Sequence, residues 1–171
     1  PMDPAAIEAA LVADPSITAP DFDFADFGAG AVAYSTQSDG RMDTLPEFTD
    51  YFILYYNKEL LAAKNIAPPV TFDEMYESAR RLNDPSRQIY GNVGRGLRNA
   101  NVVLYSSFLL GTQQRDFLDA QRRLISDSPD AIWAGEFYKK LLRDCSPPGV
   151  SGFNWNESQT TFMQGRAAFW L

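Results

Sequence analysis

The sequence predicts an α/β domain in which helices flank a largely parallel sheet, and three observations support this fold class. First, residues 51–56 (YFILYY) form an apolar run without polar alternation, which is typical of a strand buried on both faces. Second, residues 88–93 and the final run 167–171 (AAFWL) are predicted to be further short strands. Third, segments with helix caps separate these strands, and no repeat or low-complexity tract interrupts them.

The helices are predicted from their capping residues. Thr71 and Glu74 have the spacing of a capping box, in which the two side chains satisfy each other's backbone amides. Asn57 is the expected cap of a short helix, and Ser128 before Pro129 is typical of another helix start. Together these signals predict helices over residues 58–64, 71–82 and 100–110, from 129 onward, and from a second capping box at 156–159 to a stop at Gly165.

The first 43 residues carry weaker signals. Asp3 before Pro4 is typical of a helix start, so a short helix is expected over residues 4–13. Residues 14–43 are rich in Pro, Asp, Phe and Gly, which favours loops, with one short element near residues 27–34. The N-terminus has no initiator Met and no signal-peptide pattern, and the chain ends within an apolar run, so we expect it to be a fragment.

Composition restricts the chemistry. The net charge is −7, with 15 basic and 22 acidic residues and no basic stripe, so nucleic acid is not an expected partner. The chain has no histidine and one cysteine, Cys145, which excludes His-based triads, zinc sites and internal disulfides. We therefore expect no metal and no cofactor. No apolar run reaches the roughly 18 to 20 residues that a membrane-spanning helix needs.

A series of short motifs follows in a fixed order from about residue 41 to the end of the chain. The motifs are Pro46, Asp50, Tyr56-Asn57-Lys58-Glu59-Leu60, Pro69, Thr71-Phe72-Asp73-Glu74, Tyr90-Gly91, Arg95-Gly96, Gly111, Pro147-Pro148-Gly149-Val150, Trp155 and Phe162-x-x-Gly165-x-Ala167-Ala168. In this order and spacing they resemble family 1 extracellular solute-binding proteins, the sugar-binding components of bacterial ABC importers. One departure is that Gly111 stands alone where many relatives have two glycines followed by an aromatic residue.

The resemblance implies a type II periplasmic-binding-protein fold, in which two α/β lobes close on a ligand by hinge motion. Residues 1–46 would be the C-terminal part of the first lobe and the crossover to the hinge. Residues 47–171 would be the second lobe, incomplete at its C-terminus. The implied ligand is a sugar or polyol, the implied partner is an ABC transporter permease, and the implied location is periplasmic or extracellular, with a lipoprotein anchor as one possibility.

Asp50 and Arg95 are the first candidate ligand-binding residues. The resemblance places Asp50 where relatives often carry a ligand-contacting acid, and a carboxylate can accept hydrogen bonds from two adjacent hydroxyls. Arg95 follows a predicted strand between Gly94 and Gly96, which would let the backbone approach a ligand closely. The other reading of Asp50 is an acid that ends a loop, and the other reading of Arg95 is a solvated surface charge.

Trp155 is the third candidate, because sugars present C–H faces that lie well on aromatic rings. It is expected in a loop between Asn154 and Asn156. Arg98, Asn99 and Asn101 are the candidate companions of Arg95. Other aromatic residues are assigned to the core, namely Phe52, Tyr55, Phe108, Phe137 and Phe162.

Two further possibilities stay open at this point. The alternative function is a carbohydrate-active enzyme that uses Asp50 together with Glu47 or Glu157, since glycoside hydrolysis needs a pair of carboxylates. A lobe without its last strands would also leave a sheet edge open, so the fragment is expected to self-associate along that edge.

Overall fold

The computed structural model describes residues 3, 5–6, 9, 23–42, 44–47, 51–114 and 116–171. The chain divides into two compact units, Pro1–Tyr51 and Phe52–Leu171, which are described separately. Most of the helix predicted over residues 4–13 lies outside the described residues, and so does Asp50. Within the described part of the chain, no helix is long and apolar enough to cross a bilayer.

The described part of the first unit includes a short 3-10 helix, η1 (Phe24–Asp26), and the α-helix α2 (Ala29–Ser35). The prediction of a short element near residues 27–34 is therefore confirmed. After α2, the Gln37 amide donates to the Arg41 carbonyl at 2.7 Å, which closes a tight turn through Gly40 at φ 84°. Glycine suits that turn because it adopts positive φ without a Cβ clash.

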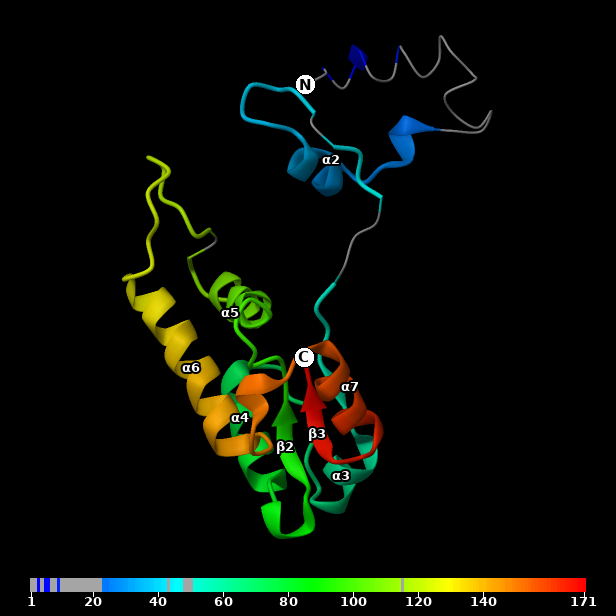
Figure 1. Ribbon diagram of the computed structural model, residues 1–171, viewed down its shortest axis with the longest axis vertical. Coiled ribbons are helices and arrows are strands. Elements are labelled where there is room, and N and C mark those ends of the chain that lie inside the picture. Colours follow the sequence, from blue (N-terminus) through cyan, green and yellow to red (C-terminus); the bar gives the residue numbers. More distant parts are fainter. Residues whose placement is uncertain are drawn as a thin grey trace. The chain divides into compact units, whose positions relative to one another are not determined.

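The second unit is built on a three-stranded sheet with the order β1-β3-β2. Strands β2 and β3 lie side by side in this sheet (Figure 1). The strands are β1 (Tyr55–Tyr56), β2 (Tyr90–Val93) and β3 (Ala167–Trp170). Strands β2 and β3 pair in parallel, whereas β1 pairs with β3 antiparallel. All four residues of β3 are buried, because it is the central strand and has helices on its faces.

The prediction of a strand buried on both faces over residues 51–56 is wrong. Only its last two residues form β1, and Tyr51 and Ile53 are 81% and 54% exposed. The reason is topological, because β1 is a short edge strand that pairs with β3 alone. Phe52 and Tyr55 are likewise 45% exposed rather than part of the core, while Phe108 and Phe137 are fully buried and Phe162 is partly buried, as predicted.

Helices surround this sheet, and three predicted caps are confirmed. The Asn57 side chain accepts from the amides of the first turn of its helix, Thr71 accepts from the Glu74 amide at 3.1 Å, and Ser128 accepts from the Ala131 amide at 3.0 Å. The predicted capping box at Thr71 differs in its second half, because the Glu74 carboxylate accepts from the Val70 amide at 2.9 Å. The helices are α3 (Lys58–Ala63), α4 (Phe72–Leu82), α5 (Asn101–Leu110), α6 (Pro129–Cys145) and α7 (Trp155–Met163), with 3-10 turns η2 (Pro85–Arg87) and η3 (Val150–Gly152).

The start of α7 differs from the predicted one. Its capping box pairs Asn154 with Glu157, whose carboxylate accepts from the Asn154 amide at 2.8 Å. The predicted box at residues 156–159 is therefore displaced by two residues. The helix starts earlier as a result, and Trp155 is its first residue rather than part of a loop.

Helix α4 lies directly against β2, because Gly91 has no side chain that would separate the two elements. A Cβ at Gly91 would lie 1.9 Å from the Ala79 carbonyl oxygen. The Gly91 amide points away from β3 and donates to the Asn83 side chain at 3.1 Å. A side-chain oxygen thus satisfies a buried strand amide that points away from the sheet and would otherwise lack a partner.

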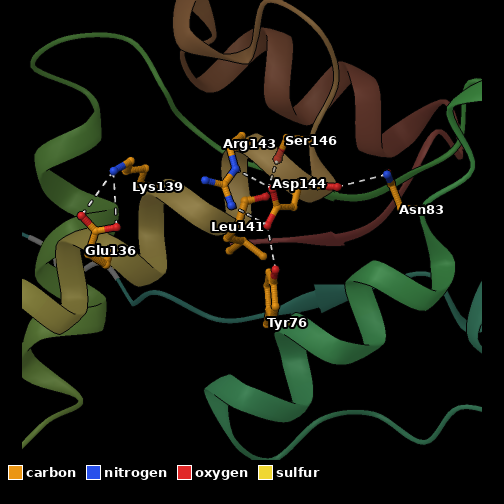
Figure 2. Close-up of polar contacts among 8 residues, drawn as sticks. All are labelled: Tyr76, Asn83, Glu136, Lys139, Leu141, Arg143, Asp144 and Ser146. Carbon is orange, nitrogen blue, oxygen red and sulfur yellow. Dashed lines mark hydrogen bonds and ion pairs between the residues drawn. The ribbon is translucent and has the colours of Figure 1, made fainter.

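A polar network then joins α4 to the end of α6 (Figure 2). Asn83 donates to the Asp144 carbonyl at 3.1 Å, and the Tyr76 hydroxyl donates to the Asp144 carboxylate at 2.7 Å. Arg143 forms an ion pair with the same carboxylate at 2.6 Å. Together with the apolar core beneath it, in which Ala79, Phe108 and Phe137 are almost fully buried, this network fixes the two helices on one face of the sheet.

Candidate functional site

The candidate site lies at the edge of the sheet where β2 and β3 end. Val93 pairs with Trp170 in the parallel ladder, so the two carboxyl ends are level. Because β1 runs the opposite way, it begins at this same edge, where Tyr55 pairs with Trp170. Open α/β sheets bind ligands outside the carboxyl ends of their strands, so this edge is the expected place for a site.

Aromatic rings cover this edge. The Tyr55 ring stacks on Trp170 with centroids 5.0 Å apart, and the Trp155 ring meets Trp170 edge to face at 5.3 Å. Phe162 completes the group at 5.7 Å from Trp170. Trp170 is only 7% exposed, whereas Tyr55 and Trp155 are each 45% exposed. The buried ring therefore supports two half-exposed rings that can offer apolar surface to a ligand.

Arg95 lies over the ring of Trp155, with its guanidinium carbon 4.8 Å from the ring centroid. This is the geometry of a cation–π contact. No described carboxylate forms an ion pair with Arg95. Its planar set of N–H donors is therefore not committed to an acid of the described chain, and it lies beside an exposed aromatic surface.

The loop that carries Arg95 is held by backbone contacts. The amides of Gly96 and Leu97 both donate to the Phe153 carbonyl, at 3.0 and 2.9 Å. A Cβ at Gly96 would lie 2.2 Å from the Val150 carbonyl oxygen. Gly96 therefore has a packing role that was not predicted, because its missing side chain makes room for the segment before α7.

Gly94 has a similar packing role. A Cβ at this position would lie 2.9 Å from a methyl carbon of Leu104 on α5. Both glycines thus bring pieces of the protein together, and Arg95 is the residue of this loop that remains a candidate ligand contact.

The predicted companions are not gathered around Arg95. Arg98 and Asn99 are exposed, and Asn99 has a positive φ of 76°. Asn101 is half-buried at the start of α5, where its amide donates to the Leu97 carbonyl at 3.0 Å. No hydrogen bond, ion pair or ring contact of the described residues joins these side chains to Arg95 or Trp155. Of the six predicted site residues, the structure brings together Arg95 and Trp155.

Three residues at this edge were not among the predicted site residues. Tyr55 and Trp170 were predicted as strand residues. Their position at the strand ends indicates a site residue only when the order of the strands in the sheet is known. Tyr138 on α6 donates its hydroxyl to the Arg95 carbonyl, a contact between residues 43 positions apart. Burial raises the pKa of Tyr138 to about 12, so this hydroxyl remains a donor at neutral pH.

A pocket of about 390 Å³ lies at the same end of the sheet, since Leu54 directly precedes β1 and Leu171 directly follows β3. Its lining is mostly apolar, and the hydroxyl of Thr71, its one polar side chain, already caps α4. The pocket therefore offers few hydrogen bonds to a hydroxylated ligand. Its lining residues are Leu54, Pro69, Val70, Thr71, Phe72, Met75, Gly111 and Leu171.

Glu157, one of the carboxylates proposed for a hydrolytic pair, serves as a helix cap. Hydrogen bonding from the Asn154 amide holds the pKa of Glu157 below its usual range, so this group stays ionised as a helix cap instead of serving as an acid. Among the described residues, no cluster of three or more His, Cys, Asp or Glu side chains could hold a metal ion. Asp50, the other half of the proposed pair, lies outside the described residues.

Known proteins resemble this chain over most of its length. The mannitol-binding protein of Pseudomonas aeruginosa is 29% identical over 138 residues, which are 77% of this chain and 31% of that protein. The sn-glycerol-3-phosphate-binding periplasmic protein UgpB of Brucella abortus is 26% identical over 155 residues, 86% of this chain and 35% of that protein. The chain thus spans about a third of the length of the curated relatives it matches.

Solved structures share its fold. Maltose-bound MalE3 of T. maritima is 31% identical, with a TM-score of 0.75 over 94% of this chain and 40% of that chain. A solute-binding protein of Agrobacterium radiobacter K84 in complex with ribitol is 24% identical, with a TM-score of 0.75 over 96% of this chain and 40% of that chain. These similarities confirm the predicted fold class, that of a type II periplasmic-binding-protein lobe.

A family profile gives the same assignment. The profile described as "Bacterial extracellular solute-binding protein" matches residues 3–171, which is nearly the whole chain. This is a family of binding proteins, so the enzymatic alternative has no support from it. The chain belongs to the family of bacterial extracellular solute-binding proteins.

Proposed function

We propose that the protein containing this chain binds a sugar or polyol outside the cytoplasm and delivers it to the permease of an ABC transporter. The observation that carries the proposal is the Arg95–Trp155 pair at the carboxyl edge of the sheet. The relatives support the ligand class, because they include a mannitol-binding protein and structures with bound ribitol and maltose.

The chemistry of the pair suits a hydroxylated ligand. A sugar or polyol has C–H groups that favour contact with an aromatic ring, and hydroxyl oxygens that accept from guanidinium N–H groups. Trp155 offers half-exposed ring surface, and Arg95 offers donors that no described carboxylate occupies. Because Arg95 covers part of the ring, we infer that the ligand meets the guanidinium and the ring together.

We further propose Asp50 as an acceptor for ligand hydroxyls. A carboxylate can accept hydrogen bonds from two adjacent hydroxyls of a sugar or polyol. Arg98, Asn99 and Asn101 are proposed as outer contacts. The exposure of Arg98 and Asn99 leaves both available to a ligand.

The division into lobes is also a proposal. Residues 1–46 would end the first lobe and lead to the hinge, and residues 47–171 would form most of the second lobe. The separation of the chain into compact units at Tyr51 and Phe52 supports a boundary in this region. Closure of the two lobes would then exclude water from the ligand.

The proposed location is the periplasm or the extracellular face of the membrane, with or without a lipoprotein anchor. A relative named as a periplasmic binding protein supports this location, and relatives named as ABC transporter-binding proteins support the permease partner. The location and the permease partner are proposed for the whole protein rather than for the 171 residues alone.

A thermal-shift screen of the whole protein tests the proposal. The panel should include mannitol, ribitol, maltose and sn-glycerol 3-phosphate, with an amino acid as a negative control. A ligand at about 100 times its dissociation constant should raise the free energy of unfolding by about 2.7 kcal/mol, which gives a clear rise in Tm. If no sugar or polyol in the panel raises the Tm, the proposed ligand class is wrong.

A further inference from the structure

We propose that Tyr138 is a positioning residue for the ligand site, because its hydroxyl fixes the backbone from which Arg95 reaches Trp155. This inference rests on the proposed function of that site. Tyr138 lies on α6, whereas Arg95 lies in the loop after β2, and the Tyr138 hydroxyl donates to the Arg95 carbonyl. It touches no ring of the site and would act through Arg95 alone.

The Arg95 loop is held from two sides. On one side, the Phe153 carbonyl accepts from the amides of Gly96 and Leu97. On the other side, the Tyr138 hydroxyl binds the carbonyl of Arg95 itself. The first contact ties the loop to the segment before α7, which carries Trp155. The second contact ties the same loop to α6. The segment before α7 and helix α6 together therefore fix the position of the Arg95 backbone.

Tyr138 is well suited to this role because its own ring is fixed. The ring is half-buried against the apolar core and lies 5.9 Å from the Phe108 ring. Burial raises its pKa to about 12, far above neutral pH, so the hydroxyl is protonated and donates throughout the pH range in which binding would be measured. A rigid donor on a packed helix restricts the loop more than a flexible side chain would.

The functional consequence concerns the entropy of binding. An arginine side chain has many rotamers, and ordering it when a ligand binds opposes binding. In the free protein, the backbone of Arg95 is already anchored and its guanidinium already lies over Trp155, so part of the side-chain entropy is lost before the ligand binds. We therefore expect loss of the Tyr138 hydroxyl to weaken ligand binding although the hydroxyl touches no ligand.

The structure offers a matched control. Tyr105 on α5 also donates its hydroxyl to a backbone carbonyl of the same unit, that of Ala131, at 3.3 Å. Replacing either tyrosine with phenylalanine removes one hydroxyl and keeps the packed ring. A purely structural role predicts that Tyr138→Phe and Tyr105→Phe behave alike. A positioning role predicts that only Tyr138→Phe changes the site.

The first experiment needs no ligand. In the whole protein with isotopically labelled arginine, the Arg95 side-chain N–H signal should be shifted upfield by the Trp155 ring current, and Trp155→Leu should remove the shift. Tyr138→Phe should reduce the shift, and Tyr105→Phe should leave it unchanged. If Tyr138→Phe preserves the full ring-current shift, or if Tyr105→Phe reduces it equally, the positioning role is wrong.

The second experiment measures binding of D-mannitol and ribitol by calorimetry. Tyr138→Phe should weaken the affinity about fivefold, the effect of one typical hydrogen bond, and Tyr105→Phe should match the wild type. In an Arg95→Ala background, Tyr138→Phe should have no further effect on affinity. An equal loss in both backgrounds would overturn the inference. If neither polyol binds the wild type, these two polyols are not its ligands and the sugars of the thermal-shift panel decide the ligand class, while the ligand-free experiment still decides the role of Tyr138.

Discussion

The guanidinium of Arg95 lies 4.8 Å from the centroid of the Trp155 ring, which joins the loop after β2 to the first residue of α7. These residues are 60 positions apart, and the parallel pairing of β2 with β3 brings their segments to one edge of the sheet. A cation held over an aromatic ring gives this edge both hydrogen-bond donors and apolar surface. That combination distinguishes it from the apolar pocket beside Leu54 and Leu171.

Replacing Trp155 with alanine tests the aromatic surface. Because the ring is 45% exposed, its loss should disturb the fold little, whereas binding of D-mannitol or ribitol should weaken about three- to tenfold, the usual worth of an aromatic contact. Met163→Ala is the matched control, since Met163 ends the same helix and is 75% exposed. Calorimetric titration of both variants would measure the difference. Unchanged affinity in a folded Trp155→Ala protein would contradict a role in binding.

Replacing Gly91 with alanine tests the contact between β2 and α4. The added Cβ would lie 1.9 Å from the Ala79 carbonyl oxygen, so one of the two elements must move. We expect the free energy of unfolding to fall by roughly 3 kcal/mol, at the upper end of typical overpacking effects. Urea denaturation measures this change.

A second glycine provides the control for that experiment. Gly135 lies inside α6, and a Cβ there would meet its nearest neighbour, the Tyr105 ring, at an ordinary 3.9 Å. Since alanine favours a helix over glycine by about 1 kcal/mol, Gly135→Ala should leave stability unchanged or raise it. Equal destabilisation by both substitutions would mean that the close approach of β2 to α4 is not the cause.

Local capping signals predicted much of the fold. Asn57, Thr71 and Ser128 mark helix starts through contacts with amides two or three residues away, so the sequence near each cap was sufficient. The exposure of residues 51–53 was not predictable in this way, because it depends on β1 being an edge strand. Burial of a strand is a property of its neighbours in the sheet, which an apolar run does not specify.

The candidate site was even less predictable from local sequence than the exposure of residues 51–53. Arg95 and Trp155 were each identified from residue type and local sequence, but their contact depends on the pairing of β2 with β3. Trp155 was also placed in a loop, because the cap at Asn154 was read two residues too late. Tyr138 gave no local signal at all, since its role lies in one hydrogen bond to a distant carbonyl.

The polar network around Asp144 predicts how stability changes in acid (Figure 2). Hydrogen bonds from Arg143, the larger cause, and from Tyr76 lower the pKa of Asp144 to about 2. The pKa of an aspartate in an unfolded chain is about 3.9. A folded pKa below the unfolded one means that the stabilisation is present above about pH 4. It is lost as the pH falls toward 2, because the folded carboxylate must then be protonated.

Asp144→Asn should therefore lower the Tm at neutral pH and flatten its fall between pH 4 and pH 2. Tyr76→Phe should have a smaller effect in the same direction, since Arg143 still pairs with the carboxylate. Thermal denaturation from pH 2 to pH 7 measures both variants against the wild type. An Asp144→Asn protein whose Tm falls as steeply as that of the wild type would show that this carboxylate does not set the acid response.

The open edge of β1 predicts that the isolated 171-residue chain self-associates. Within the described residues, strand β1 pairs only with β3, and the residues just before it are exposed and apolar, including Tyr51 and Ile53. An uncovered edge of this kind can pair with the same edge of a second copy. Sedimentation velocity should therefore show mass that rises with concentration, and the dye ANS should bind the exposed apolar surface.

A charge placed beside that edge should oppose the association. Ile53→Lys should shift the chain toward monomer, because a lysine at a strand edge resists burial in an intermolecular sheet. Val102→Lys is the control, since Val102 is 59% exposed on α5 and is not part of the sheet. If the two substitutions reduce association equally, general charge repulsion rather than edge pairing is responsible. A monodisperse wild-type monomer that binds no ANS would contradict the open edge itself.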